Sequence, residues 1–152
     1  MISLRNYTYS DINFLQEHGY GHYSPDELKK LIDTWNSKIY DNSYFEMFAI
    51  DNGIEIVGYG SLYQRAKTMI SCGLEIYSEY QRKGYATIAY RQLLDIAEQK
   101  GYAVAVAQVL VDNVASIALH KKLGFEAENY EYINKKGDKV YYFIKSLSCF
   151  RG

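Results

Sequence analysis

The clearest periodicity along the chain lies between Tyr85 and Gln99, where apolar residues recur every three or four positions. This spacing gathers them on one face of a helix. The residue pair Lys100-Gly101 follows, and it supplies a basic last turn and a glycine at which the helix can end. The next segment, Ala103–Val111, is apolar almost throughout, which is typical of a strand that is covered on both faces and parallel to a neighbour.

The first part of the chain alternates short apolar segments with polar ones. Ile2–Thr8 predicts a first strand, and the polar stretch Asp11–His18 predicts a helix. Ser24-Pro25-Asp26-Glu27 then combines an N-cap residue, a proline at the first helical position and a glutamate three residues after the serine. We therefore expect a second helix that ends at about Trp35 or Asn36.

Antiparallel strands are predicted after this helix. Phe45–Asp51 and Glu55–Leu62 are joined by Asn52-Gly53, a pair that tolerates positive φ at both positions, so the two segments should form a hairpin. Thr68–Tyr77 predicts one more strand before the periodic helix. Strand, helix and apolar strand together form a crossover unit of two parallel strands.

The last part of the chain predicts a helix and a closing hairpin. Asp112-Asn113 can cap a helix that extends through Leu123, with Gly124 as its terminal residue. The hairpin has Glu126–Ile133 and Lys139–Ser146 as its arms. This order of elements indicates a mixed α/β fold, and the 152 residues fit a single domain.

Charge and hydropathy exclude several partners. The net charge is −1, which offers no electrostatic basis for binding nucleic acid. The longest strictly apolar run, Ala103–Ala107, is far shorter than the roughly 20 residues that cross a bilayer. Because the first residues also lack the apolar stretch of a signal peptide, we expect a cytoplasmic protein with no membrane partner.

Cysteine and tyrosine content narrow the chemistry further. Cys72 and Cys149 belong to no Cys-x-x-Cys pair and are too few for a disulfide framework or a zinc site, so we expect free thiols and no metal. The 17 tyrosines are unusual. Their amphipathic rings suit either the faces of a sheet or the walls of a small-molecule cleft.

The candidate chemistry lies where the strand Thr68–Tyr77 leads into the helix that begins at Tyr85. Gly84 and Ala86 are small residues at this joint, so that backbone N–H groups and the positive end of the helix can face an anion. Arg82 and Lys83 add positive charge at the rim. A turn glycine with no ligand explains the loop equally well. The absence of a Gly-Lys-Ser/Thr or G-x-G-x-x-G pattern counts against a nucleotide-binding domain.

Two motifs that follow one another along the chain favour a ligand-binding loop over a turn without a ligand. Gln81-x-x-Gly84-x-Ala86 and the later segment Asn113-Val-Ala-Ser116-Ile-Ala-Leu-His120-Lys-Lys-Leu-Gly-Phe125 together resemble the GCN5-related N-acetyltransferase (GNAT) superfamily. The resemblance is close over residues 73–125. It implies the GNAT fold, which is a central, mostly antiparallel sheet with one parallel, splayed strand pair and flanking helices.

The resemblance also implies an activity. In this family an amine attacks acetyl-CoA directly in a ternary complex, the glycine-containing loop holds the pyrophosphate, and the preceding strand pairs with the pantetheine arm. A backbone N–H near Ile76 or Tyr77 would stabilise the oxyanion. The positions that the resemblance assigns to coenzyme binding are Leu74, Ile76, Tyr77, Gln81, Arg82, Lys83, Gly84, Tyr85, Ala86, Thr87, Asn113 and Ser116.

Three residues are candidates for proton transfer. Glu75 should point to the opposite face from Leu74 and Ile76, where it is either the base that accepts the amine proton or a carboxylate paired with a cation. Tyr77 is either a proton donor or a wall of the pocket. His120 stands where many relatives carry a tyrosine that protonates the thiolate, and an imidazolium could replace it, but a packed helix histidine is the alternative.

Other residues near these motifs allow two interpretations each. Asn113, Ser116 and His120 share one helix face, although a capping role explains Asn113 and a surface position explains Ser116. His18 and His22 flank Gly19-Tyr20-Gly21, in the region that shapes the acceptor site of family members. Zinc binding there lacks supporting ligand spacing.

The sequence therefore predicts an acetyl-CoA-dependent N-acetyltransferase that acts on a primary amine of a small molecule, protein or peptide. The alternative from another class is an acyl-CoA-binding sensor without transferase activity, which is suggested by the histidine at position 120. Aminoglycosides, polyamines, amino-acid derivatives and peptide N-termini all remain open as acceptors. The resemblance also leaves a homodimer open.

Overall fold

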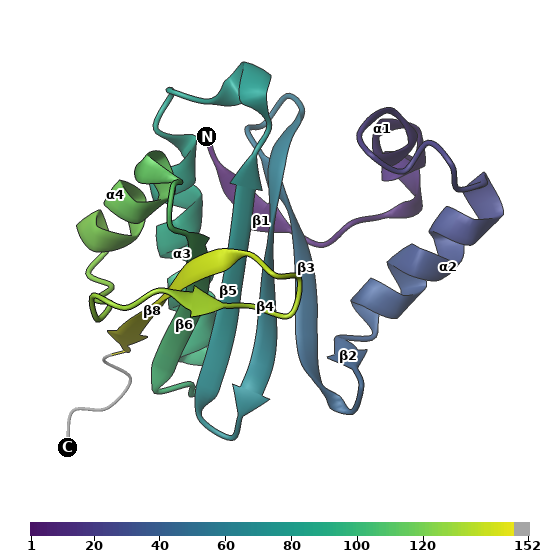
Figure 1. The fold of residues 1–152 in the computed structure, drawn as a ribbon. Coiled ribbons are helices and arrows are strands. Elements are labelled where there is room, and N and C mark those ends of the chain that lie inside the picture. The colour runs from purple at the N-terminus through teal and green to yellow at the C-terminus, as the bar shows by residue number, and fades with distance from the viewer. Residues whose placement is uncertain (148–152) are drawn as a thin grey trace.

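A mixed sheet forms the body of the computed structural model, which describes residues 1–147 (Figure 1). The strand order is β1-β3-β4-β5-β6-β8-β7, and β2 pairs with the beginning of β3. The strands are β1 Ser3–Arg5, β2 Ile39–Tyr40, β3 Ser43–Asp51, β4 Ile56–Ala66, β5 Met69–Ile76, β6 Val104–Leu110, β7 Tyr132–Ile133 and β8 Lys139–Ser146. The helices are α1 Ile12–Glu17, α2 Pro25–Asn36, α3 Tyr85–Gln99 and α4 Val114–Lys122, with short 3-10 turns at Tyr9–Asp11 and Ser78–Tyr80.

The strands β5 and β6 form the one parallel pair among residues 1–147, as predicted for the crossover unit. They pair only over Met69–Ser71 and Val104–Val106. The rest of β5 stays paired with β4, and the rest of β6 stays paired with β8. The two parallel strands therefore separate toward their carboxyl ends, which confirms the splayed pair.

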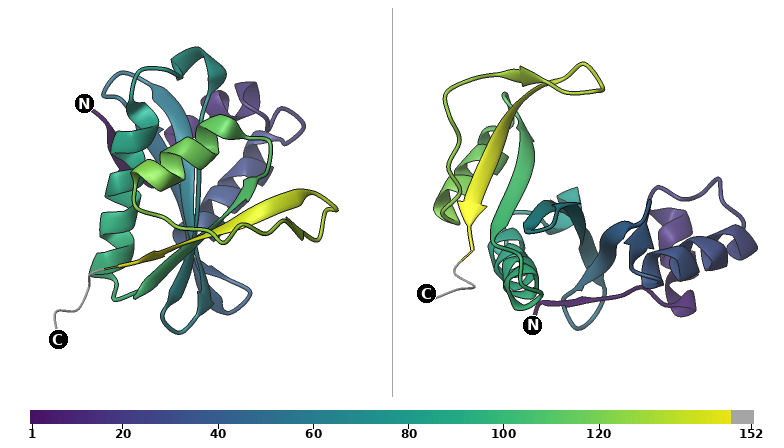
Figure 2. Two further views of the ribbon diagram at one scale, coloured as in Figure 1. Left: turned by 60° about the vertical axis from the view of Figure 1, so that its left-hand side comes forward. Right: turned by 90° about the horizontal axis from the view of Figure 1, so that it is seen from below.

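Helices cover both faces of the sheet, and the alternation of side chains along β3 explains how. Met47 and Ala49 pack toward α2, whereas Phe48 and Ile50 pack into clusters that contain residues of α3. Figure 2 shows α1 and α2 on one side of the strands and α3 and α4 on the other. The protein thus has two cores separated by the sheet.

The local signals for three helices are confirmed. At the start of α2, the Ser24 hydroxyl accepts the N–H of Glu27 while the Glu27 carboxylate accepts the N–H of Ser24. The helix α3 spans the predicted residues. Asn113 caps α4, and Gly124 follows it with a φ of +91°.

Two predictions near the amino terminus need correction. The first strand ends at Arg5 instead of Thr8, because Tyr7 turns into the core beneath α2. In the hairpin loop only Gly53 has a positive φ, of +94°. The side-chain oxygen of Asn52 accepts the N–H groups of Ile54 and Glu55, so the connection is a wider loop than a two-residue turn.

The predicted arm Glu126–Ile133 is mostly wrong as a strand. Only its last two residues form β7, and Glu126 makes an isolated bridge to Ile144. The residues between carry no alternating apolar pattern, and the Tyr132 hydroxyl donates to the Glu128 carboxylate within the segment. The short strand β2 was not predicted from the sequence.

Cys72 is a buried free thiol, and burial raises its pKa to about 12. Cys149 lies outside the described residues. Among residues 1–147, no cluster of three or more His, Cys, Asp or Glu side chains could hold a metal ion. None of the helices in that range has the length and apolarity that a membrane crossing requires.

Candidate active site

The free edge of β5 and the beginnings of α3 and α4 meet at one end of the sheet (Figure 1). This arrangement follows from the parallel pairing, because parallel strands end on the same side and each is followed by a helix. From Cys72 to Ile76, β5 has no partner on β6 in the described structure. Its backbone groups on that edge therefore face the gap between the two strands.

The loop that leads into α3 has an unusual backbone. Arg82 and Gly84 both have positive φ, of +66° and +80°, and Gly84 is the N-cap of the helix. A Cβ atom added at Gly84 would meet nothing within 4 Å, so the space beside the loop is open. The first N–H groups of α3 and the positive end of its dipole point into this region. Such a region suits an anion.

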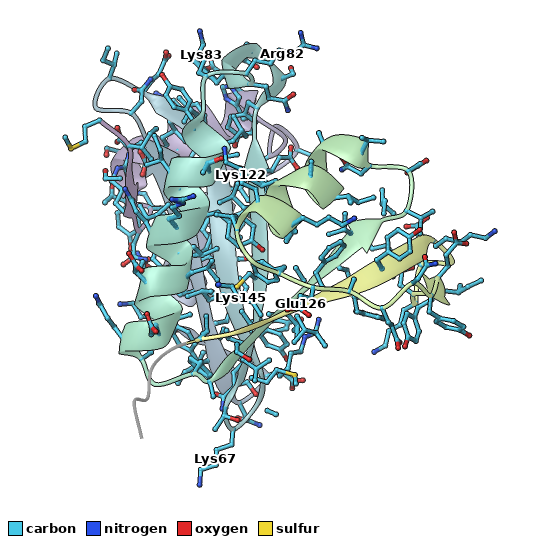
Figure 3. All side chains as sticks on the ribbon, turned by 90° about the vertical axis from the view of Figure 1, so that its left-hand side faces the viewer. Lys67, Arg82, Lys83, Lys122, Glu126 and Lys145 are labelled. Atoms are coloured by element: carbon cyan, nitrogen blue, oxygen red, sulfur yellow. The ribbon has the colours of Figure 1, made fainter. Side chains whose placement is uncertain are left out.

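The side chains of the loop fall into three groups. Arg82 and Lys83 are exposed and project from the end of the molecule opposite Lys67 (Figure 3). Tyr85 and Ala86 are partly buried against the core beneath α3, and Thr87 is half-buried in its first turn. The side chains of this first turn therefore leave its backbone accessible.

Gln81 fixes the loop to the strand. Its Nε2 atom donates a hydrogen bond of 2.9 Å to the carbonyl oxygen of Ile76 at the end of β5. The side chain of Ile76 is buried against Ala89 of α3, and Leu74 packs on the same side. The end of β5 and the loop are thus held in one arrangement, although sequence reasoning expected Gln81 to contact the coenzyme.

The candidate residues on α4 form a chain of hydrogen bonds. The Asn113 side-chain oxygen accepts the N–H of Ser116 at 3.0 Å. The Ser116 hydroxyl lies 3.4 Å from Nδ1 of His120, and the Ser116 carbonyl oxygen lies 2.8 Å from the same atom. Because a carbonyl oxygen only accepts, Nδ1 carries the proton in this contact.

His120 is buried between α3, α4 and the sheet, with 6% of its surface exposed. Its Nε2 atom lies 2.9 Å from the hydroxyl of Tyr90, and its ring makes edge contacts with the rings of Tyr90 and Phe125. Burial lowers the pKa of His120, and the hydrogen bond to Ser116 offsets only part of this effect. A charged imidazolium is therefore disfavoured here.

Glu75 and Tyr77 lie on the opposite face of β5 from Ile76, as predicted from strand alternation. There they line a cavity of about 440 Å³ between the sheet and the segment that contains α1 and α2. Its lining residues are Tyr7, His18, Gly19, Tyr20, His22, Tyr23, Trp35, Met47, Tyr59, Glu75 and Tyr77. The end of β5 thus contributes to this cavity on one face and to the gap toward β6 along its edge.

The electrostatics of this cavity depend on one carboxylate. Glu75 accepts a hydrogen bond of 3.1 Å from the hydroxyl of Tyr59. Burial, together with nearby ionisable groups that include Glu75, raises the pKa values of Tyr59 and Tyr77 to about 12. Both phenols therefore keep their protons at neutral pH and act as hydrogen-bond donors.

A glycine on β4 permits the local shape of β5. A Cβ atom at Gly58 would lie 2.1 Å from the carbonyl oxygen of Glu75, so no side chain fits at this position. Immediately beside it, the N–H of Tyr77 donates to the Val57 carbonyl oxygen at 2.9 Å. This close approach fixes the backbone that carries the two candidate catalytic side chains.

Sequence reasoning found part of this site. It named Glu75, Tyr77 and the region around His18 and His22, all of which the fold brings to the cavity. It missed Tyr7, Tyr59 and Trp35; the high tyrosine content was the only signal for the two tyrosines, and nothing pointed to Trp35. The α4 candidates and the loop lie on the other face of the sheet, with His120 directed into the core.

A splayed parallel pair, an open glycine-containing loop at a helix start and an acceptor-sized cavity on the adjoining strand define the class of coenzyme A-dependent acyltransferases. The family model described as an acetyltransferase (GNAT) domain matches residues 4–126, and the chain belongs to this family. The protein is accordingly an acetyl-CoA-dependent acetyltransferase. Comparison with curated proteins gives no match.

Solved structures share this fold at low sequence identity. yncA from Salmonella typhimurium, solved with acetyl-CoA, is 16% identical, with a TM-score of 0.74 and coverage of 100% of this chain and 97% of that chain. Spermidine N-acetyltransferase from Vibrio cholerae with CoA and spermine is 22% identical, with a TM-score of 0.75 and coverage of 97% and 96%. RimL, a ribosomal L7/L12 alpha-N-protein acetyltransferase with CoA, is 18% identical, with a TM-score of 0.78 and coverage of 98% and 96%.

Proposed function

We propose that this protein transfers the acetyl group of acetyl-CoA to a primary amine, by direct attack within a ternary complex. The proposal rests on the position of β5 between the gap toward β6 and the cavity. One edge of the strand is free in the gap toward β6, and one face presents Glu75 and Tyr77 to the cavity. An amine in the cavity would therefore meet a thioester in the gap at the end of the same strand.

The residues around the gap fit the coenzyme. The backbone N–H groups that follow Gly84 would bind the pyrophosphate, with Arg82 and Lys83 adding positive charge. The free edge of β5 from Leu74 to Tyr77 would pair with the pantetheine arm. Asn113 and Ser116, at the start of α4, would contact the coenzyme from the side of β6, while Gln81 positions the loop. When bound, the coenzyme supplies an acyl group that is already activated as a thioester.

Glu75 is the proposed base. Its carboxylate lies in the cavity wall and is exposed, so an ammonium group or a water molecule can reach it. Removal of a proton from the ammonium frees the nitrogen lone pair for attack on the thioester carbonyl. The backbone N–H of Tyr77 already donates to the Val57 carbonyl oxygen, so of the two candidate donors the N–H of Ile76 would stabilise the oxyanion that develops.

Tyr77 is a better candidate than His120 for donating to the leaving thiolate. Its protonated phenol faces the cavity, whereas the His120 ring is buried with both nitrogens in hydrogen bonds. A phenol with a pKa of about 12 holds its proton more tightly than a thiol near 8.5, so Tyr77 would act chiefly by hydrogen bonding. His120 is then a packing residue that positions α4 against α3.

The burial of His120 keeps a second candidate function open. If the family's tyrosine acid has no substitute, the protein would bind acyl-CoA as a sensor without transferring the acetyl group. The two functions share coenzyme binding and differ in turnover. A panel of primary amines therefore separates them.

Thermal unfolding with acetyl-CoA, coenzyme A and ATP in parallel tests coenzyme binding. A ligand at about 100 times its dissociation constant adds about 2.7 kcal/mol to the stability of the native state. We expect stabilisation by both coenzymes and none by ATP. Stabilisation by ATP alone would indicate a nucleotide-binding domain, and no response to either coenzyme would overturn the proposal.

Thiol release from acetyl-CoA with an amine panel tests transfer. We expect amine-dependent release, and binding without release from any amine would favour the sensor. The variant Glu75→Gln should change the pH dependence of turnover while leaving the stabilisation by acetyl-CoA intact. A pH profile equal to that of the wild type would indicate that water, and not Glu75, accepts the amine proton.

Three further properties stay predictions. The chain is expected to fold as a single domain and to reside in the cytoplasm, and a homodimer is left open. Spermidine N-acetyltransferase from Vibrio cholerae, which shares this fold, has a dodecameric structure. Light scattering of the purified protein measures the oligomeric state directly.

A further inference from the structure

The rings in the cavity fall into two groups. Near the strand end, Tyr77 lies with its ring centre 5.1 Å from that of His18 and 6.2 Å from that of Tyr59. Beside α2, the ring of Tyr20 lies 5.8 Å from that of Tyr23 and 5.9 Å from that of Trp35. The cavity therefore has an end beside β5 and an end beside α2, and both are aromatic.

The one carboxylate that lines the cavity lies at the first of these ends, beside β5. Among the lining residues, all of which lie in the described part of the chain, Glu75 is the only carboxylate, and there is no lysine or arginine. An ammonium group beside Glu75 would be neutralised and would also face electron-rich rings. The end beside α2 offers ring faces and phenol hydroxyls. Two other carboxylates, Asp11 near Tyr7 and Glu27 near His22, lie outside the lining and are already bonded to Arg5 and to the N–H of Ser24.

This distribution of charge disfavours acceptors with several positive charges. A second ammonium group of a polyamine would enter the part of the cavity around Tyr20 and Trp35, where it would lose water without meeting a carboxylate. A flat, apolar group would bury its surface there instead. A volume of about 440 Å³ is within the range of small-molecule sites.

We propose that the acceptor is a primary amine with a single positive charge and a flat apolar body, of the arylalkylamine class. Its ammonium group binds at Glu75, and its ring lies among Tyr20, Tyr23 and Trp35. The inference rests on the proposed function, because it identifies the acceptor for that same transfer.

The reaction balances with this acceptor. The ammonium loses one proton to Glu75, the nitrogen forms a bond to the acetyl carbon, and the carbon–sulfur bond breaks with its electron pair leaving on sulfur. A second proton leaves the nitrogen as the amide forms, and the thiolate takes up one proton to become coenzyme A. The amide product is uncharged, so it loses the attraction of Glu75 and should leave readily.

Trp35 provides a direct measure of acceptor binding, since it is the only tryptophan in the chain and lines the cavity. Its fluorescence should change on titration with 2-phenylethylamine. We expect spermidine and N-acetyl-2-phenylethylamine to bind at least about tenfold more weakly, because one adds unpaired charge and the other lacks a charge. Equal affinity for spermidine would overturn the proposal.

Two variants with matched controls locate the binding. Glu75→Gln should weaken 2-phenylethylamine about tenfold, whereas Glu17→Gln, which removes an exposed carboxylate outside the cavity lining, should leave it unchanged. Tyr23→Leu should weaken it severalfold, and Tyr130→Leu, an exposed tyrosine distant in sequence from the cavity residues, should not. Glu75→Gln with full affinity would also overturn the proposal.

Two combinations of results distinguish a failure of this inference from a failure of the proposed function. Stabilisation by acetyl-CoA together with thiol release from spermidine, but no response of Trp35 to 2-phenylethylamine, would overturn the acceptor class and leave N-acetyl transfer standing. Glu75-dependent binding of 2-phenylethylamine without any stabilisation by acetyl-CoA would support the amine site and overturn the transferase.

Discussion

His120 is a polar side chain within a largely apolar cluster, and its hydrogen bonds explain how the core accepts it. The proton on Nδ1 is donated to the Ser116 carbonyl oxygen, which leaves Nε2 to accept from the Tyr90 hydroxyl. Both ring nitrogens are satisfied in the neutral form, and burial disfavours the charged form. The arrangement joins α4 to α3 and tolerates no extra charge.

This burial predicts a pH dependence of stability. The pKa of His120 is lowered in the folded state, so the unfolded chain binds a proton that the native protein does not. The free energy of unfolding should therefore fall as the pH drops below about 6.5 and level off below the lowered pKa. Urea unfolding at about pH 7.5 and about pH 5.5 measures the change.

The variant His120→Gln isolates this contribution, because glutamine can bond to Tyr90 but does not titrate in this range. We expect it to flatten the dependence of stability on pH between those two values. His22→Gln, at an exposed position, is the matched control and should keep the wild-type dependence. An unchanged slope in His120→Gln would show that His120 is not the group responsible.

At the scale of elements, the start of α3 is built by three independent features. Positive φ at Arg82 and Gly84 turns the chain, and Gln81 ties the turn to the carbonyl oxygen of Ile76. A positive φ is unfavourable for a residue other than glycine, and Arg82 adopts one in this loop. These contacts within the chain fix the course of the loop beside the end of β5.

Gly84→Asp tests the anion site. The carboxylate would add bulk and negative charge where the pyrophosphate is proposed to bind, so stabilisation by acetyl-CoA should be largely lost. Gly137→Asp is a close control, because that glycine also has a positive φ, of +87°, and also has nothing within 4 Å of an added Cβ. The control should lose similar backbone stability yet keep its response to acetyl-CoA; equal responses of the two variants would contradict the assignment.

At the scale of the whole molecule, Arg5 connects the layer that covers the cavity to the sheet. From β1, it bonds to Asp51 of β3 through Nε at 2.9 Å and to Asp11 through Nη1 at 2.9 Å. Asp11 directly precedes α1 and is 7% exposed. Burial alone would raise the pKa of Asp11, but hydrogen bonds from Arg5 and Thr8 bring it below its ordinary value.

Arg5→Met should therefore destabilise the fold by about 2 kcal/mol at neutral pH, because two carboxylates lose a charged partner. Asp11 and Asp51 both have lowered pKa values in the native state, so their contribution is present above about pH 4 and lost as the pH falls through those lowered values. The variant should show a weaker loss of stability with acid than the wild type. Urea unfolding at neutral and acid pH measures it.

Arg91→Met is the control for this prediction, since Arg91 is an exposed arginine of α3 on the other face of the sheet. It should remain within about 0.5 kcal/mol of the wild type. If Arg5→Met behaves in the same way, the contacts of Arg5 add nothing measurable. The helical layer would then be held by its apolar core alone.

Local signals in the sequence determined most of the helices. The capping box at Ser24, the periodic apolar face of Tyr85–Gln99 and the cap at Asn113 each act within a few residues, so neighbouring residues are enough to predict them. The glycine-containing loop belongs to the same class, because its conformation arises beside the helix it caps. The arm Glu126–Ile133 was mispredicted because its course depends on contacts with β8, which are distant in the sequence.

The tertiary structure alone decided the cavity and the environment of His120. Tyr7, Trp35, Tyr59 and Tyr77 are far apart along the chain, and only strand register and helix packing bring them together. Likewise, the helical spacing of Asn113, Ser116 and His120 predicted a shared face and left a catalytic or a packed His120 open; only the tertiary structure places its ring in the core. Local sequence sets which elements form, whereas burial and pairing between distant segments set which side chains share a site.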